Sequence, residues 1–358
     1  MSEKLRVGVI GVGTIATMMH IPTLRATGRA KITAICRRTE RYLAIAQERL
    51  SVAEAYTDWQ EMLDKAELDA VVVSTPHNLH TEPVISALDR GLHVMVDKPM
   101  ALKATDAWAM VAAARRADRV LMVAYNGRLS AESRAVKAAL THGRIGKVRQ
   151  IIGTGIGRYS YYFDERVVPE SIRGIVRHLS GMPDEFFNDW AVPEEYWRAD
   201  VTQNGGGLFV DGGTHAVDRA LWLGGAPAVE VTAIMDDGLA KPDLHASVQA
   251  RLKNNVLVTL TMSDLKADVT DGNRWMIVGD DGVLTMDGTG IKAQTRAGQE
   301  EIQPEGPDMF PAFPFVSCIL DGAPNPIPGE AGAHAVAFVE AAYRSAAEKT
   351  VVQVTSPS

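Results

Sequence analysis

The 358-residue chain has little cysteine, few aromatic residues and no excess of positive charge. Its two cysteines, Cys36 and Cys318, are too far apart in sequence to indicate a disulfide framework or a metal cluster. The 37 lysines and arginines are outnumbered by 44 aspartates and glutamates, which gives a net charge of −7. Because no basic tract counters that charge, we expect no nucleic-acid partner.

Long uninterrupted hydrophobic runs are also missing. Residues 7–24 carry no Asp, Glu, Lys or Arg, a stretch as long as a membrane span, but three glycines, His20 and Pro22 interrupt it. The residues before it do not lead into a signal-peptide core with a cleavage site. We therefore expect a cytoplasmic protein without a membrane partner.

The chain does contain enough hydrophobic sequence, 46%, for a large core divided between two domains. Up to residue 124, apolar β-branched runs alternate with amphipathic helical segments. This alternation predicts an α/β domain at 1–124 with a doubly wound parallel sheet, whose ligand lies at the carboxyl ends of the strands. The expected strands are 5–10, 31–37, 70–75, 92–96 and 120–125, and the expected helices are 104–117 and a segment within 82–91.

The pattern changes after residue 124, where strand-like segments are joined by short polar turns. Lys253-Asn254-Asn255 and Asp281-Gly282 are hairpin signals. Residues 125–358 are therefore expected to form an α+β domain with a large, mostly antiparallel open sheet. Helices on one face of such a sheet leave the other face to be buried, which favours a homo-oligomer. The expected strands are 147–155, 228–235, 244–252, 256–262, 274–279 and 283–286.

Gly11-Val12-Gly13-Thr14-Ile15-Ala16 directly follows the first expected strand and begins a helix. Gly11 permits a tight turn, Gly13 leaves room for a pyrophosphate, and Ala16 lets the helix pack closely on the strand. The amides at the helix start, including those of Thr14 and Ile15, face the anion. The pattern predicts a dinucleotide-binding Rossmann domain, although a glycine-rich turn in another α/β domain has the same local sequence.

Two segments that follow other expected strands contribute to the cofactor site. Ser74-Thr75-Pro76 forms a turn past the cofactor, and Asn78 offers a donor and an acceptor to the ribose or the nicotinamide. His77 and His80 are three residues apart, but no cysteine or carboxylate nearby completes a ligand set, so we expect no metal. His80 is expected to be a structural or cofactor-side residue.

The second expected strand ends in Cys36-Arg37-Arg38-Thr39, without an acidic residue to bind the adenosine ribose. Arg37 and Arg38 can hold the 2′-phosphate of NADP. They can also stack on the adenine or face solvent. We favour NADP over NAD as the cofactor.

A catalytic set is expected from Asp97-Lys98-Pro99 and from Gly205-Gly206-Gly207, which leads to Asp211 and His215. Oxidation of a secondary alcohol requires a group to take the hydroxyl proton, and a histidine titrates near neutrality. Asp211, four residues before His215, lies on the same helix face and can orient the imidazole or bind a second hydroxyl. Lys98 can stabilise the developing alkoxide. Taken singly, the three have plainer explanations: a solvated lysine, a structural histidine and a capping aspartate.

Substrate contacts are expected from two further segments. Asn126 and Arg128 follow the fifth strand, and Trp197-Arg198 precedes the glycine run. An aromatic face and a fork of donors suit a sugar ring, although tryptophans are more often part of the core. Residues 158–200 are rich in side chains that either line the substrate pocket or form a solvated surface: Arg158, Tyr159, Tyr161, Tyr162, Arg166, Arg173 and Arg177.

These motifs together resemble the Gfo/Idh/MocA oxidoreductases over essentially the whole chain. The resemblance is carried by the glycine turn and by residues 74–80, 91–99 and 205–218. It implies a Rossmann domain and a second domain whose large antiparallel sheet builds dimers or tetramers. It also implies NAD or NADP as cofactor, a sugar or polyol as substrate, a cofactor-side position for Asp97 and His80, and catalytic roles for Lys98, Asp211 and His215. Where the family has Glu-Lys-Pro this chain has Asp97-Lys98-Pro99, so the shorter carboxylate is expected to hold its structural partner less closely.

Our leading hypothesis is an NAD(P)-dependent oxidoreductase that acts on a sugar, cyclitol or related polyol. A second is a glycoside-cleaving enzyme that oxidises its substrate transiently, eliminates the aglycone and accumulates no reduced nicotinamide. A third is a non-catalytic nucleotide sensor, which has no need of Lys98, Asp211 and His215 as a set.

Overall fold

A computed structural model describes residues 4–160, 163, 197–236, 241–265 and 272–355. The chain divides into two compact units. The first contains, among the described residues, 4–124, 197–198 and 310–330, and the second contains the remainder. Residues 310–330 thus belong to the first unit, although they follow most of the second in sequence. Within the described ranges, no helix is long and apolar enough to cross a membrane.

The first unit is built on a six-stranded parallel sheet with the order β3-β2-β1-β4-β5-β6, which confirms the predicted doubly wound sheet. All four residues of β4, Ala-Val-Val-Val, are buried, as a strand covered on both faces requires. The strand order reverses beside β1, where ligands of such sheets bind. The strands are β1 (Leu5–Ile10), β2 (Ala30–Cys36), β3 (Glu54–Tyr56), β4 (Ala70–Val73), β5 (His93–Val96) and β6 (Leu121–Val123).

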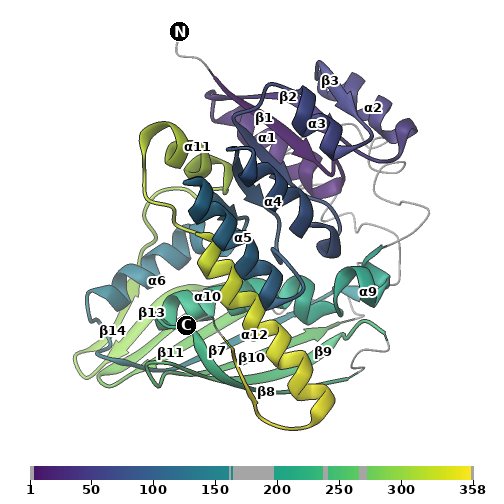
Figure 1. Cartoon of the computed structure of the whole chain (residues 1–358). Coiled ribbons are helices and arrows are strands. Elements are labelled where there is room, and N and C mark those ends of the chain that lie inside the picture. The colour runs from purple at the N-terminus through teal and green to yellow at the C-terminus, as the bar shows by residue number, and fades with distance from the viewer. Residues whose placement is uncertain (1–3, 161–162, 164–196, 237–240, 266–271, 356–358) are drawn as a thin grey trace. The chain divides into compact units, whose positions relative to one another are not determined.

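Helices of the first unit begin and end at recognisable signals. Asp58 caps the start of α3 by accepting a hydrogen bond from Glu61 N, and α5 ends at Asp118, whose φ is +50°. Helices α4 and α5 pack against each other, and α1 packs against α11 from far downstream (Figure 1). The helices are α1 (Ile21–Ala26), α2 (Glu40–Leu50), α3 (Trp59–Lys65), α4 (Thr81–Asp89), α5 (Ala104–Ala117) and α11 (Ala312–Asp321).

The segment after α11 completes the edge of the parallel sheet. Val123 N of β6 donates to Ile327 O at 3.1 Å, and Asn325 Nδ2 donates to Leu121 O at 3.0 Å. The outer edge of β6 is therefore paired with chain that lies some two hundred residues downstream.

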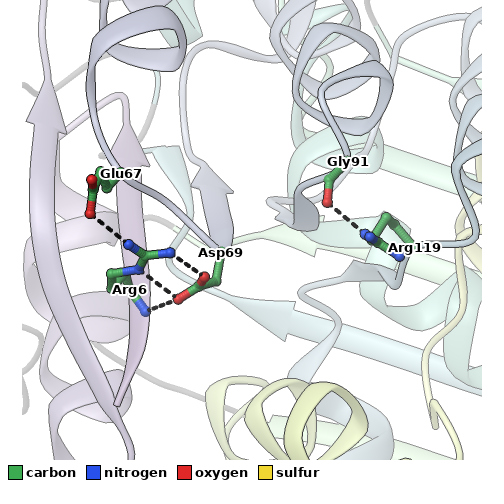
Figure 2. A network of polar contacts seen from close by, with 5 residues as sticks. All are labelled: Arg6, Glu67, Asp69, Gly91 and Arg119. Atoms are coloured by element: carbon green, nitrogen blue, oxygen red, sulfur yellow. Dashed lines mark hydrogen bonds and ion pairs between the residues drawn. The ribbon is translucent and has the colours of Figure 1, made fainter. Parts of the chain in front are cut away.

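Polar contacts fix the amino ends of the strands (Figure 2). Arg6 of β1 donates to both carboxylate oxygens of Asp69, just before β4, and to Glu67 at 2.8 Å. The hydrogen bonds from Arg6 hold the pKa of Asp69 below its usual range. Arg119 Nε donates to Gly91 O at 2.6 Å in the connections before β6 and β5. These contacts lie at the amino ends of the strands. The ligand is expected at the opposite, carboxyl ends.

The second unit is built on a nine-stranded sheet with the order β14-β13-β12-β11-β7-β10-β9-β8-β15. Its neighbouring strands are antiparallel except β7 and β10, which confirms the predicted mostly antiparallel sheet. Asn255 adopts φ +67° in the tight β9–β10 turn signalled by the two asparagines. The strands are β7 (Val148–Gly157), β8 (Ala228–Met235), β9 (His245–Leu252), β10 (Leu257–Asp264), β11 (Gly272–Gly279), β12 (Gly282–Asp287), β13 (Gly290–Thr295), β14 (Gly298–Ile302) and β15 (Val352–Gln353).

Helices α6, α10 and α12 lie along one face of this sheet (Figure 1). Alternate residues of β9 are buried beneath them and the others are exposed, the period expected of a sheet with one covered face. Ser345 of α12 ties this layer to β8 by accepting a 3.0 Å hydrogen bond from Ala233 N. The helices are α6 (Ala131–Thr141), α9 (Val201–Asn204), α10 (Thr214–Gly224) and α12 (Gly329–Glu348), which starts in the first unit.

Candidate functional site

The glycine turn lies at the carboxyl end of β1. Gly11 has a φ of +87°, and a Cβ there would lie 2.6 Å from backbone atoms of Ser74, which follows β4. Only glycine fits this position. A Cβ on Gly13 would meet no atom within 4 Å, so the missing side chain leaves open space beside the turn.

The helix after the turn begins at Thr14, and Thr17 N donates to Gly13 O at 3.0 Å. The N–H groups of Thr14, Ile15 and Ala16 precede that bond, and N–H groups in this position of a helix bind anions. The open space beside Gly13 and these amides fit the pyrophosphate of a dinucleotide.

A π-helical turn, Ala16–His20, interrupts this helix, with Ile21 N bonded to Ala16 O. Pro22 has no N–H to donate, and helices commonly change their bonding pattern beside such a residue. His20, the last residue of the turn, is buried.

Asp97-Lys98-Pro99 follows β5, which is two strands from β1 in the sheet. The Asp97 carboxylate accepts a 2.6 Å hydrogen bond from Ser74 Oγ, and its other oxygen lies 3.3 Å from His20 Nε2. Although burial opposes ionisation, the imidazole, the hydroxyl and the neighbouring ammonium hold the pKa of Asp97 well below its usual range. Asp97 therefore holds Ser74 by a short hydrogen bond, and the looser hold expected from its shorter side chain, relative to a glutamate, stays a prediction. Lys98 itself is half-buried.

His80 joins this loop to the turn after β4. Its Nε2 lies 2.8 Å from Thr75 O and its Nδ1 lies 3.0 Å from Pro99 O. Burial lowers the pKa of His80, and a neutral imidazole donates through only one of its nitrogens. His80 thus has a structural position between two predicted cofactor segments. Asn78, in the short turn His77–Leu79, is exposed.

The two arginines after β2 differ in their surroundings. Arg37 Nη1 donates to Val12 O of the glycine turn at 2.7 Å, and its guanidinium lies 4.7 Å from the centroid of the Tyr42 ring. Arg38 is exposed. Arg41 is also exposed, and its guanidinium lies 5.8 Å from the same ring. Arg37 is therefore engaged with the glycine turn. Arg37 and Arg38 directly follow β2 without an acidic residue between them and the strand, and Arg41 lies in the first turn of α2.

In the second unit, one continuous helix carries both predicted catalytic residues. Asp211 lies in a π-helical turn, Phe209–Gly213, and is buried. His215 is the second residue of α10, which continues directly from that turn, and is half-buried. Departures from α-helical bonding of this kind are frequent at functional sites.

Tyr125 supports the start of α10. Its hydroxyl lies 2.8 Å from Thr214 Oγ1, and its ring stands edge-on to His215 with 5.8 Å between centroids. Burial raises the pKa of Tyr125, so its hydroxyl stays protonated at physiological pH. The two hydroxyl-bearing residues flank the predicted base.

Arg128, predicted to bind substrate, forms a buried ion pair with Asp218 of α10. Its Nε and Nη2 donate to the two carboxylate oxygens at 2.7 and 2.6 Å. Asn126 begins the same short turn, Asn126–Leu129, and is half-buried. The pair attaches this turn to the helix that carries His215.

Trp197 and Arg198 lie in the first unit beside the turn after β4. The Trp197 ring stands edge-on to His77 with 4.8 Å between centroids, and the Arg198 guanidinium lies 4.3 Å from the Trp197 ring centroid. Tyr159 N donates to Asp264 Oδ1 at 2.6 Å in the second unit. Other residues named from the 158–200 segment lie outside the described residues: Tyr161, Tyr162, Arg166, Arg173 and Arg177.

The structure brings the predicted site residues together in two groups. The glycine turn, the turn after β4 and the Asp97 loop lie on adjoining strand ends of the first unit. Asp211 and His215 share a helix of the second unit with Thr214 and Asp218. Sequence reasoning gave no role to four buried residues of these sites, His20, Thr214, Asp243 and Tyr343. Thr214 lies within the motif at residues 205–218, whereas the other three belong to no motif and are recognisable only by their burial.

Comparisons with known proteins agree with this architecture. A family described as "Oxidoreductase family, NAD-binding Rossmann fold" matches residues 5–125, and the "GFO/IDH/MocA C-terminal domain" matches residues 173–285.

The chain is 25% identical over 370 residues to the myo-inositol 2-dehydrogenase of Thermotoga maritima, an alignment that covers 98% of each protein. It is 29% identical over 249 residues to the 1,5-anhydro-D-fructose reductase of Ensifer adhaerens, which covers 69% of this chain but only 65% of that protein. The solved WlbA dehydrogenase of Bordetella pertussis, in complex with NADH and UDP-GlcNAcA, superposes with a TM-score of 0.77 at 22% identity, covering 99% of this chain and all of that one.

Proposed function

The chain belongs to the Gfo/Idh/MocA family of oxidoreductases, and from that premise we propose that it transfers a hydride between a nicotinamide cofactor and a secondary alcohol or ketone of a sugar, cyclitol or related polyol. One observation carries the proposal. The open glycine turn and the loop that bears Lys98 lie at the carboxyl ends of β1 and β5 in the same sheet, with the turn after β4 between them.

The cofactor is held by residues at these strand ends. The amides of Thr14 and Ile15 bind the pyrophosphate beside Gly13. The turn with Ser74, Thr75, Pro76 and Asn78 would contact the ribose and nicotinamide of a bound cofactor, and its backbone is fixed by Asp97 and His80. A bound nicotinamide accepts or returns the hydride.

The catalytic residues are Lys98, Asp211 and His215. His215 takes the hydroxyl proton when the alcohol is oxidised and returns it when the ketone is reduced. The ammonium of Lys98 stabilises the charge that develops on the substrate oxygen. Asp211 orients the imidazole or binds a second hydroxyl of the substrate.

NADP is the cofactor we favour. Arg37 and Arg38 directly follow β2, where a carboxylate would bind the ribose of NAD, and Arg41 lies close by in the first turn of α2. Because Arg37 bonds to Val12 O, we assign the 2′-phosphate chiefly to the exposed guanidinium of Arg38. Changing Arg38 to Ala should then weaken NADPH binding more than NADH binding, whereas an equal loss for both cofactors contradicts the preference.

We assign the substrate contacts to the polar groups of the segments predicted for this role. Asn126 and Trp197-Arg198 offer donors, an acceptor and an aromatic face to a sugar ring. Arg128 contributes through the turn that it fixes to Asp218. The relatives reported above are named as a dehydrogenase of an inositol and a reductase of an anhydro sugar, and both names support a polyol-like substrate.

A panel of sugars, inositols and sugar acids tests the function directly. Turnover is followed at the nicotinamide absorbance with NAD, NADP and their reduced forms. Lys98→Met should lower kcat strongly and leave cofactor binding intact. Arg90→Met, which removes a solvent-exposed pair with Asp64 in the same unit, serves as the control. No turnover with any substrate, or undiminished turnover in Lys98→Met, contradicts the proposal. Neither the glycoside-cleaving nor the sensor hypothesis is favoured by the names of the relatives.

A homodimer or homotetramer is the assembly we propose, formed through the face of the nine-stranded sheet opposite its helices. Large apolar side chains stand on that face, with Ile234 exposed by 78%, Met276 by 42% and Leu257 by 41%. Met276→Glu should dissociate the assembly in light scattering, while Thr289→Glu in the β12–β13 turn should leave its mass unchanged. We also propose that the enzyme works in the cytoplasm, where its two free cysteines, both buried, remain reduced.

A further inference from the structure

A buried carboxylate and a buried phenol meet the glycine run in the second unit. Asp243 precedes β9 and Tyr343 lies on α12, so both are remote in sequence from residues 205–207. The Tyr343 hydroxyl donates to Asp243 Oδ1 at 2.5 Å. Burial and the neighbouring carboxylate raise the pKa of Tyr343 well above its usual value, which keeps the donated proton on the phenol.

This pair accepts every backbone N–H at the start of the helix that carries Asp211 and His215. Asp243 Oδ1 accepts from Gly207 N at 2.8 Å, and Asp243 Oδ2 accepts from Phe209 N at 2.9 Å. The Asp243 backbone oxygen accepts from Leu208 N at 2.7 Å. The Tyr343 hydroxyl accepts from Gly207 N and from Val210 N, each at 3.1 Å. The next amide, Asp211 N, makes an intrahelical bond to Gly207 O at 3.1 Å.

Four consecutive N–H groups are therefore satisfied by two residues that are not part of the helix, three of them by side-chain oxygens and that of Leu208 by the Asp243 backbone oxygen. The first four N–H groups of a helix have no partner within it and are usually capped by a neighbouring residue or by water. Here the cap comes from Asp243 and Tyr343, both buried. A carboxylate in this place also complements the positive end of the helix dipole.

The same contacts explain two of the three glycines. A Cβ on Gly206, whose φ is +150°, would lie 2.3 Å from the Tyr343 hydroxyl oxygen. A Cβ on Gly207 would lie 2.1 Å from Asp243 N. The glycine run is thus required by the close approach of the cap, and the substrate need not contact it at all.

We infer that Asp243 and Tyr343 are positioning residues for the reaction, which set the start and the register of the helix from which Asp211 and His215 project. The first amides fix where the helix begins, and Asp211 lies in the π-helical turn immediately after them. Loss of one capping acceptor leaves a buried N–H without a partner, and this is relieved by a shift of the first turn. A displacement of about 1 Å at a catalytic group is enough to lower turnover by about a hundredfold.

The inference rests on the proposed function for its kinetic part, and the test separates the two. Tyr343→Phe removes the hydroxyl and keeps the ring. Ser345→Ala is the matched control, because it removes another buried hydroxyl of α12 that accepts a backbone N–H, at a point away from the glycine run. Asp243→Asn is the second variant, in which one accepting oxygen becomes an NH2 group that faces backbone donors.

Three measurements are made on the full-length protein. Hydrogen exchange of peptides spanning 205–215 should speed up in Tyr343→Phe and stay unchanged in Ser345→Ala. The ¹³Cε1 NMR signal of His215, identified by its loss in His215→Gln, should shift in Tyr343→Phe and stay in place in Ser345→Ala. With an active substrate, kcat should fall about tenfold or more in Tyr343→Phe and less than about twofold in the control, with cofactor binding equal in both.

Unchanged exchange at 205–215, or an unmoved His215 signal, overturns the inference whether or not a substrate is known. Faster exchange with a kcat equal to that of Ser345→Ala overturns it as well, since the cap would then have no effect on the reacting groups. If the wild-type protein turns over no sugar or polyol, the proposed function fails, and the exchange and His215 signals still decide whether the pair positions the helix.

Discussion

The buried pair of Arg128 and Asp218 gives the sharpest energetic prediction. Their side chains are exposed by only 9% and 1%, and two hydrogen bonds of 2.6 and 2.7 Å join them. Asp218→Asn leaves a buried guanidinium without its counter-charge, and removing one partner of such a pair costs about 3–5 kcal/mol. The pair between Arg251 and Glu230 is largely exposed, so Glu230→Gln should cost about 0–1 kcal/mol.

The complementary variant has a distinct pH signature. Burial already raises the pKa of Asp218 above its usual value. Without the guanidinium, in Arg128→Met, that pKa rises further and Asp218 keeps its proton in the folded state. A group whose folded-state pKa is raised loses its stabilising contribution as the pH increases. Arg128→Met should therefore lose more stability at pH 8 than at pH 5.

Urea unfolding at both pH values, followed by tryptophan fluorescence, measures these losses, and the KM for substrate is measured in parallel. A structural role predicts a large loss of stability with a small change in KM. Two outcomes refute this reasoning: a loss below about 1 kcal/mol for Asp218→Asn, or a large rise in KM at unchanged stability. The second outcome assigns Arg128 directly to the substrate.

Three further predictions concern the first unit. Burial lowers the pKa of His80 below the usual 6.5. The free energy of unfolding should therefore decrease as the pH falls below about 6.5, by up to about 1.4 kcal/mol per pH unit. Denaturation at a series of pH values measures this slope, which His80→Gln should flatten. Gly11→Ala should lower both the melting temperature and the cofactor affinity, because the new Cβ would overlap the backbone of Ser74. Gly28 also has a positive φ, but a Cβ there would meet no neighbouring atom, so Gly28→Ala should leave the cofactor affinity unchanged. Burial raises the pKa of the Cys36 thiol to about 12, so this thiol should react with a disulfide reagent at pH 8 only at the rate of unfolding, and fast labelling in the native state contradicts its burial.

Elements with a strong local signal were predictable from the sequence. The helix Ala104–Ala117 and the strand Leu5–Ile10 match their expected bounds, because each depends on a periodic run of apolar residues and a nearby turn or cap. The expected strand 70–75 is shorter, since Ser74 leaves the sheet to bond with Asp97. Strands Gly290–Thr295 and Gly298–Ile302 were not expected. The first alternates over only two buried residues, Ile291 and Ala293, and the second is a mainly polar strand at the edge of the sheet.

The candidate site was predictable where a motif is contiguous. The glycine turn at Gly11 and the loop at Lys98 are short sequences that lie, as expected, at strand ends of the parallel sheet. The contacts of Asp243 and Tyr343 were not predictable, because the two residues lie 36 and 136 positions from Gly207, whose backbone N–H donates a hydrogen bond to each of them. Such pairings depend on the tertiary fold, and a single sequence contains no local signal for them.

The return of residues 310–330 to the first unit has a consequence for how the protein is made. During synthesis the outer edge of β6 stays unpaired until Asn325 and Ile327 have been made. The nucleotide-binding half should therefore reach its native form only after nearly the entire polypeptide has left the ribosome. A fragment that stops at residue 124 would present that unprotected edge to other chains and aggregate. Anyone expressing this half alone should graft the downstream segment onto it.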